Sequence, residues 1–293
     1  MNGWILILLS PVVLVIEWLT ARTMAPFCRR FNILAHAMGG RHELRPAALG
    51  AALLIAFLVP LIFLVNVYPV TALDELYPPE MQSLFITAIS VAGLVLLLWG
   101  WRCDRGHCGL ESILILWTSY AVVWSAGLRI EQISLGGFGL GGTLHLPTVV
   151  SLVVTILWLT VVASVIELLD GVDGLAALVC LLIALASLGF SLLQGTGDHL
   201  VILYSWLLAL VSGMSAWLGR PSGKFLLGKN GCYLLGFWVA TLTILARHKG
   251  TTAKVLTPLL ILGLILIAIL FRFVEKSLGF GGGKPVKRRL PRK

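Results

Sequence analysis

The chain has 293 residues, of which 58% are hydrophobic and only 12% are charged, and its mean hydropathy is +0.98. Soluble domains carry about 25% charged residues, so this composition excludes a soluble globular protein, a disordered chain and a collagen-like chain. The formal net charge of +9 does not indicate nucleic acid, because the sequence has no zinc finger and no basic stretch interleaved with aromatic residues. Basic residues of membrane proteins gather in cytoplasmic loops instead. We therefore predict a polytopic membrane protein that binds no nucleic acid.

Nine apolar stretches follow one another along the chain, and each is about long enough to cross a hydrocarbon core of roughly 30 Å as a helix. Only helices and closed barrels satisfy the backbone in lipid, and stretches this long are not strands. We therefore predict an all-α polytopic membrane protein with about nine transmembrane helices. The nine stretches are Trp4–Thr20, Ala47–Val67, Ser83–Trp101, Ser112–Leu128, Pro147–Leu169, Gly174–Gln194, His199–Leu218, Gly231–Ala246 and Val255–Val274.

The positions of the basic residues predict the orientation in the membrane. Most of the 22 Lys and Arg residues lie in alternate loops and in the tail, which makes that side cytoplasmic. We expect the N-terminus outside, the C-terminus in the cytoplasm, and the protein in the inner (plasma) membrane. Residues 1–276 would form a single helical bundle and residues 277–293 a basic cytoplasmic tail. The loop Arg247–Lys254 places basic residues on the predicted outer side, against this pattern, so the charges do not decide the orientation of the last hairpin.

A glycine-rich segment, Ile133–Pro147, lies on the predicted outer side. A phosphate-binding loop would need a helix N-terminus on the correct face, whereas glycines with apolar alternation around them favour a short exposed β-hairpin. We expect this hairpin to contain the only strands of the chain.

Three carboxylates, Glu167, Asp170 and Asp173, lie where the fifth predicted span ends and the sixth begins, on the cytoplasmic side. Carboxylates close to hydrocarbon are costly and are usually functional where they occur. Asp173 would also serve as an N-cap for the next helix. From the residues alone, function and simple capping both remain open. Glu17 lies near the end of the first predicted span, and we interpret it as a side chain that reaches the membrane interface.

Four segments resemble the motifs of polyprenyl-phosphate N-acetylhexosamine-1-phosphate transferases, the WecA/MraY-like family, and they follow one another along the chain in the same order as in the family. The run Asp170–Ala176 resembles the end of the family signature N-A-V-N-x-x-D-G-x-D-G-L-A. The segment Arg45–Gly50 resembles P-x-P-x-x-G-G, and Gly100–Asp104 lies where the family has G-x-x-D-D. The segment Lys224–Cys232, followed by Gly236 and a phenylalanine, lies where the family has F-M-G-D-x-G-S and then G-F.

The resemblance implies an activity, a cofactor and partners. The family transfers a sugar-1-phosphate from a UDP-sugar to a polyprenyl phosphate for cell-envelope polysaccharides and releases UMP. Two polyanions meet in this reaction, so Mg²⁺ screens their charge and carboxylates hold the metal. The expected partners are the polyprenyl phosphate, a UDP-sugar and, within envelope synthesis, other proteins. A cytoplasmic cleft would be built from the motif loops.

The departures from the family pattern concentrate in its polar residues. Cys103 replaces the first of the paired aspartates, and Lys229 replaces the metal-binding aspartate of G-D-x-G-S. Ser164 and Glu167 stand at the two asparagines of N-A-V-N. Residues 281–293 contain no counterpart of the family's C-terminal histidines.

Lys229 bears most directly on the metal. Two unit charges 4 Å apart interact by about 4 kcal/mol at an effective dielectric of 20, so an aspartate attracts a divalent ion by about twice that amount and a protonated lysine repels it by a similar amount. A metal site of the family type is therefore not expected, and its ligands stay unknown. The ammonium of Lys229 would bind phosphate in the cation's place, or Glu167 would supply a relocated ligand. The resemblance implies catalytic positions at Asp104, Asp170 and Asp173, and substrate-binding positions at Lys229, Glu167, Gly228 and Gly231.

Three functions remain open at this stage. The first is a degenerate family member with impaired or absent catalysis, acting as a lipid-binding or partner-binding subunit. The second is an active transferase with a rebuilt metal site, which would use Mg²⁺. The third is an unrelated membrane transporter, against which the near absence of acids inside the spans argues.

Overall fold

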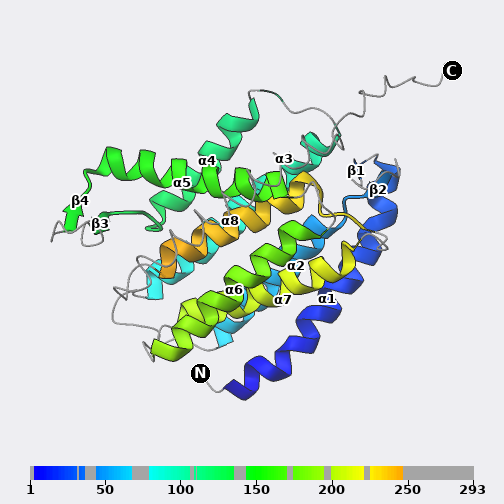
Figure 1. The fold of residues 1–293 in the computed structure, drawn as a ribbon, viewed down its shortest axis with the longest axis horizontal. Coiled ribbons are helices and arrows are strands. Elements are labelled where there is room, and N and C mark those ends of the chain that lie inside the picture. Colours follow the sequence, from blue (N-terminus) through cyan, green and yellow to red (C-terminus); the bar gives the residue numbers. More distant parts are fainter. Residues whose placement is uncertain are drawn as a thin grey trace, which may run out of the picture.

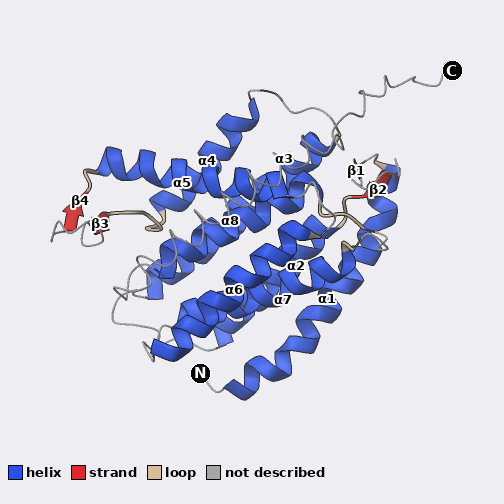
Figure 2. Ribbon diagram, viewed as in Figure 1, coloured by secondary structure: helices blue, strands red, loops and turns tan. Residues whose placement is uncertain are grey.

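The computed structural model describes residues 3–31, 33–36, 44–67, 79–105, 109, 111–134, 143–169, 174–194, 199–220 and 225–246. Within these residues the chain forms helices with two short pairs of strands (Figures 1 and 2). In chain order the elements are α1 (Gly3–Arg30), β1 (Leu34–His36), β2 (Leu44–Pro46), α2 (Leu49–Val67), α3 (Pro79–Asp104), α4 (Glu111–Ser125), β3 (Gln132–Ser134), β4 (Thr143–His145), α5 (Thr148–Leu169), α6 (Leu175–Gln194), α7 (His199–Leu218) and α8 (Gly228–Ala246).

Each of the first eight predicted spans coincides with one helix of the described residues. The ninth predicted span and the basic tail lie outside the described residues. Five of the helices are long and apolar enough to cross a membrane, and α2 contains a shorter apolar helix, Leu49–Leu64. The helical prediction is therefore confirmed for the described residues, whereas the number nine stays a prediction. The five are Leu6–Arg30, Ser83–Asp104, Thr148–Leu169, Leu175–Leu193 and His199–Leu218.

Helix α1 extends well beyond the predicted end of the first span, from Thr20 to Arg30. Its last two turns continue the buried stripe of the helix through Ala25 and Cys28, which form a small apolar cluster with Ala47 and its neighbours at the start of α2. Because these turns bury apolar side chains, the helix continues past the first basic residues of the loop.

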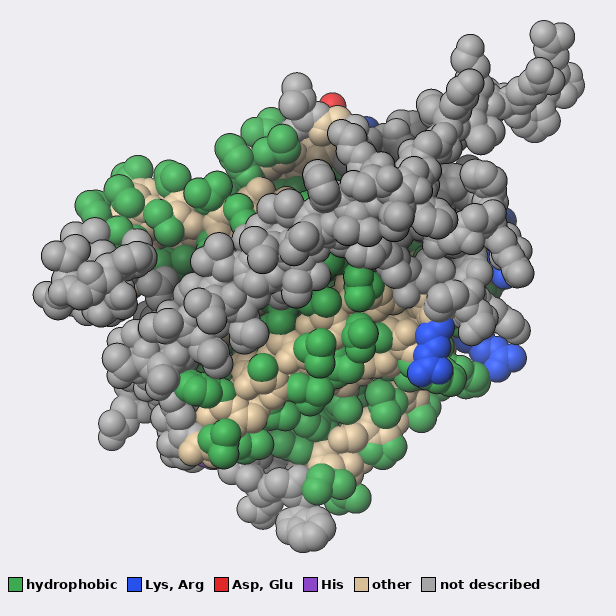
Figure 3. All heavy atoms as spheres, in the orientation of Figure 1, with side chains coloured by type: hydrophobic (Ala, Val, Ile, Leu, Met, Phe, Trp, Pro, Cys, Tyr) green, Lys and Arg blue, Asp and Glu red, His purple; other side chains and the backbone are tan. Residues whose placement is uncertain are grey.

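Helix α8 is the centre of the bundle. It packs against α2, α3, α5, α6 and α7, and all its residues except Lys229 and Ala246 are buried. The outer helices instead carry exposed apolar side chains such as Val149 and Leu193, and Figure 3 shows many hydrophobic side chains on the described part of one face. A bundle with a buried central helix and an apolar outer surface is the arrangement expected of a protein surrounded by lipid.

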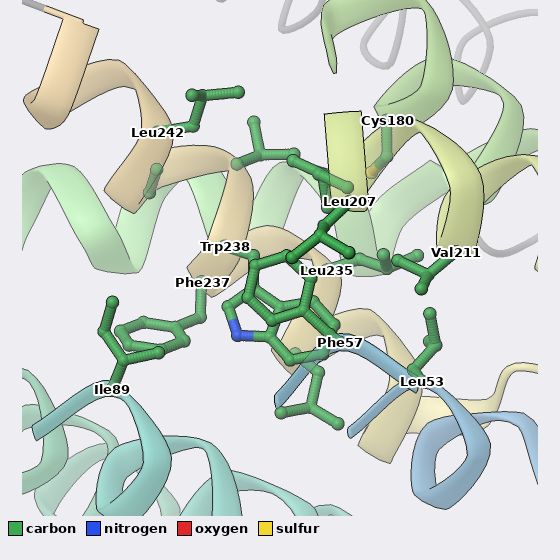
Figure 4. Packing of buried hydrophobic residues seen from close by; sticks show 14 of the residues in the cluster. Leu53, Phe57, Ile89, Cys180, Leu207, Val211, Leu235, Phe237, Trp238 and Leu242 are labelled. Atoms are coloured by element: carbon green, nitrogen blue, oxygen red, sulfur yellow. The ribbon is translucent and has the colours of Figure 1, made fainter. Parts of the chain in front are cut away.

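Aromatic side chains fill the contact between α8 and its neighbours (Figure 4). Trp238 of α8 stacks on Phe57 of α2 with ring centroids 4.1 Å apart, and Phe57 meets Tyr204 of α7 edge to face at 4.9 Å. All three side chains are fully buried. Such aromatic pairs add about 0.5–1.5 kcal/mol each beyond the area they bury, so they help to hold α2, α7 and α8 together.

Two antiparallel strand pairs lie among the helices. Strand β1 pairs with β2 after α1, and β3 pairs with β4 before α5. The pairing of Ile133 with Leu144 falls within the segment predicted to form a hairpin, whereas the β1–β2 pair lies elsewhere in the chain and was not predicted. The connection between β3 and β4 lies outside the described residues, so the complete hairpin stays a prediction.

The closest approach of α5 and α8 gives a test of this packing. A Cβ at Gly236 would lie 2.5 Å from the Cα of Ala163, whereas a Cβ at Gly189 of α6 would meet nothing within 4 Å. We expect Gly236→Ala to destabilise the protein by about 1–3 kcal/mol through overpacking. Gly189→Ala, the matched control, should be neutral or stabilising by up to about 1 kcal/mol. Thermal unfolding in detergent measures both, and equal melting temperatures for the two variants would contradict the packing.

Candidate functional site

The carboxylate of Asp104, the last residue of α3, caps the start of α8. Its Oδ1 accepts a hydrogen bond from the backbone N–H of Lys229 at 2.9 Å, and its Oδ2 accepts one from Nδ2 of Asn230 at 3.0 Å. The first N–H groups of a helix have no partner within the helix, and a carboxylate there is also favoured by the helix dipole. This cap explains why α8 begins at Gly228, three residues before the predicted span.

Asn230 connects the same point to a third helix. Its side-chain amide also donates to the carbonyl oxygen of Ala47 at 3.1 Å, just before α2. The side chain is fully buried and fills space that two glycines leave open. A Cβ at Gly50 would lie 2.0 Å from Asn230 Oδ1, and one at Gly100 would lie 2.3 Å from Asn230 Cα. The glycines of two family-like motifs therefore have a structural reason here.

The predicted substrate-binding glycines also lie at this junction. Gly228 has a φ of +67°, and a Cβ there would lie 2.8 Å from Cβ of Ala47 and 3.0 Å from Oδ2 of Asp104. A Cβ at Gly231 would lie 2.5 Å from Cδ1 of Leu227. Packing accounts for glycine at both positions, and their role in substrate binding stays a prediction.

The ammonium of Lys229 lies 3.2 Å from Oε1 of Glu167, which belongs to the last turn of α5. The two side chains are 42% and 32% exposed, so the ion pair contributes at most about 1 kcal/mol to stability. Both charges also act on the carboxylate of Asp104. The ends of α3 and α5 and the start of α8 thus bring together two acids and one base, which we call the Lys229 cluster (Asp104, Glu167 and Lys229).

Five of the seven predicted site residues therefore meet at one end of the bundle. The other two, Asp170 and Asp173, lie outside the described residues. The described residues resume at Gly174, which has a φ of +80°. Gly174 lies against the end of α7, since a Cβ there would be 3.2 Å from the carbonyl oxygen of Ala216. The five are Asp104, Glu167, Gly228, Lys229 and Gly231.

The described residues do not fit the Mg²⁺ ion that the family resemblance implies. Both oxygens of Asp104 already accept hydrogen bonds from the start of α8, and Glu167 faces the ammonium of Lys229. A divalent ion between these acids would meet that positive charge. Within the described part of the chain, no three His, Cys, Asp or Glu side chains are grouped so that they could hold a metal.

Two residues acquire importance that the sequence did not reveal. Asn230 stands at the variable position of the G-D-x-G-S motif, so the motif gave no signal for its two interhelical hydrogen bonds. The interpretation of Glu17 as an interfacial side chain is wrong, because α1 continues to Arg30 and Glu17 is fully buried. Its spacing of four residues from Val13 and Ala21, both buried, was a signal that it lies on the inward face of the helix.

A bundle of long apolar helices with a charged cluster at one end is the arrangement of a multi-pass membrane protein. The chain matches glycosyl transferase family 4 over residues 86–247, more than half of its length and a range that contains the whole Lys229 cluster. The protein belongs to this family, and the resemblance to WecA/MraY-like transferases is confirmed.

A relative with a described activity is similar to this chain. The probable undecaprenyl-phosphate N-acetylglucosaminyl 1-phosphate transferase of Bacillus subtilis (strain 168) is 25% identical over 199 residues. The match covers 66% of this chain and 53% of the relative, so the chain spans about half the length of that protein.

The cap at the start of α8 can be tested by stability. Asp104→Ala leaves the backbone N–H of Lys229 without an acceptor and leaves the amide of Asn230 only the Ala47 carbonyl, so we expect a loss of about 1–2 kcal/mol. Glu131→Ala is the control, because the Arg129–Glu131 pair is 42% and 48% exposed and should contribute less than about 1 kcal/mol. Thermal unfolding in detergent compares the two, and a smaller loss for Asp104→Ala than for Glu131→Ala would show that the cap is not needed.

Proposed function

We propose that this protein is a family member that holds a polyprenyl phosphate at the Lys229 cluster and lacks the Mg²⁺-dependent transfer of a sugar-1-phosphate. The observation that carries the proposal is the 3.2 Å contact between Lys229 and Glu167. By the motif resemblance, the lysine occupies the position of a metal-binding aspartate and the glutamate that of an asparagine. Aspartate to lysine adds two positive charges and asparagine to glutamate removes one, so together the two changes make the site more positive by one charge and supply a cation built into the chain.

An ammonium held in this way suits a phosphate group. Lysine has three N–H donors, and a contact with Glu167 orients the side chain in the manner of the lysine–glutamate pair that positions phosphates in protein kinases. Lys229 is 42% exposed, which leaves the side chain accessible at the membrane face. Asp104, Asp170 and Asp173 are the acids that we place around the bound headgroup, and Gly228 and Gly231 the glycines.

The orientation follows from the charges at the same end of the bundle. Arg29 and Arg30 end α1 and Arg102 lies in the last turn of α3, beside the cluster. Because basic residues favour the cytoplasmic side, we place the cluster there, in the inner membrane, with the N-terminus outside and the C-terminus inside. A single bundle of residues 1–276 with a basic tail, 277–293, completes the proposal, and a subunit of this kind would serve partner proteins of envelope synthesis.

One observation favours an active enzyme as the second candidate. Glu167 contacts Lys229 and lies near enough to Asp104 to act on its carboxyl electrostatically. If the side chain of Lys229 moved away, two acids would remain close together. Mg²⁺ accepts one or two carboxylates together with substrate phosphates. In that case Glu167 would act as a rebuilt metal ligand.

The test uses the purified full-length protein in detergent with undecaprenyl phosphate and UDP-N-acetylglucosamine. We expect no UMP release above that of heat-denatured protein, with or without Mg²⁺. We also expect lipid phosphate binding that survives EDTA and weakens by about tenfold or more in Lys229→Gln, since a hydrogen bond to a charged group contributes about 1.5–3 kcal/mol.

Arg220→Gln is the control, because it removes an exposed cation at the end of α7 that stacks on Trp217. Equal weakening by both variants would reduce the binding to general charge attraction and contradict the proposal. Mg²⁺-dependent UMP release would also contradict it, and loss of that release in Glu167→Gln would establish the second candidate.

A further inference from the structure

The carboxyl of Glu17 is buried inside a helix that is long and apolar enough to cross the membrane. It lies near the middle of the segment Leu6–Arg30 and, like Val13 and Ala21, has no exposed surface. Residues four apart share a helix face, so Glu17 lies in the apolar stripe by which α1 packs against the bundle. An acid in such a position indicates function more often than it indicates packing.

The carboxyl has one polar contact and one oxygen without any. Ser215 of α7 donates a hydrogen bond from Oγ to Oε1 of Glu17 at 2.6 Å. Oε2 is buried and has no hydrogen-bond partner among the described residues, although buried polar groups almost always have a partner.

The neighbouring helices supply no positive charge to Glu17. Helices α2 and α7, which pack against α1, contain no Asp, Glu, Lys or Arg within their bounds. Arg22 of α1 stacks over the ring of Trp18, 5.2 Å from its centroid. Arg45 belongs to β2, a strand that contacts α1. This strand leads to Ala47, whose carbonyl oxygen accepts a hydrogen bond from the thiol of Cys28, three turns after Glu17 along α1.

A buried carboxylate is stable only when a positive charge accompanies it. Since none of the described residues provides one at this interface, we infer that the charge comes from solution. We propose that Glu17 and Ser215 form a binding site for one small cation, a proton or a sodium ion, between α1 and α7. Carboxylate and hydroxyl oxygens are suitable partners for either cation. No residue of the Lys229 cluster takes part, so the proposal does not depend on the proposed function.

The site lies close beneath the polar end of the bundle. Ser215 is one turn before Gly219, and a Cβ at Gly219 would lie 3.0 Å from the Ser215 carbonyl oxygen and 3.8 Å from Cα of Gly174. The cation would therefore fix α1 to the part of α7 that supports the start of α6.

The test uses full-length protein in detergent and two measurements. The infrared difference spectrum between the native protein and Glu17→Gln shows whether a protonated carboxyl is lost. The melting temperature in sodium chloride, compared with N-methylglucamine chloride, shows whether sodium is bound. Glutamine retains an acceptor for Ser215 and needs no cation, so we expect this variant to fold, and the exposed Glu131→Gln is the control.

A carbonyl band of a protonated carboxyl that is present in the native protein and absent in Glu17→Gln assigns the proton. A rise in melting temperature with sodium that is lost in Glu17→Gln assigns the sodium ion. An ionised Glu17 whose melting temperature does not depend on sodium overturns the proposal, as does an identical response in Glu131→Gln. Should Glu17→Gln not fold, Ser215→Ala decides in its place, because removal of the donor must shift the Glu17 carbonyl band or weaken the sodium effect.

Discussion

The hydrogen bonds between Asp104 and the start of α8 hold the polar end of this protein together. A single carboxylate at the end of α3 accepts from the backbone of Lys229 and the side chain of Asn230, and Asn230 in turn donates to Ala47 before α2. Three helix ends thereby meet at one buried point. The glycines around that point leave room for the asparagine, and the central helix enters the bundle from it.

The position of Lys229 follows from this constraint. Because its backbone N–H is fixed by Asp104, its side chain leaves α8 at the polar end and reaches Glu167 at the end of α5. In the motif pattern of the family, these two positions hold an aspartate and an asparagine. The pair therefore changes from one acid and one neutral amide, with a net negative charge, to a base and an acid that neutralise each other. Under the proposed function this chain keeps the fold of the family without its chemistry, and fold and chemistry are separable in general.

The helices could be predicted because continuous apolar stretches have one stable form in lipid. Their ends could not, since they depend on contacts between distant residues. Helix α8 begins early because of Asp104, more than a hundred positions away in the chain, and α1 ends late because Cys28 packs near Ala47. The meeting of Asp104, Glu167 and Lys229 was implied by the motif resemblance, but the ion pair required the geometry. The burial of Glu17 could be predicted from its spacing of four residues from the apolar residues Val13 and Ala21, which places all three on one face of the helix.

The central claim is that the ammonium of Lys229 stands where a divalent ion would otherwise be bound. The most direct measurement is a titration of the purified protein with Mn²⁺, as a paramagnetic substitute for Mg²⁺, followed by electron paramagnetic resonance in the presence of UDP-N-acetylglucosamine. The account predicts weak uptake without saturation that is the same in the native protein and in Glu167→Gln. One saturable Mn²⁺ ion per chain that is lost in Glu167→Gln would contradict it.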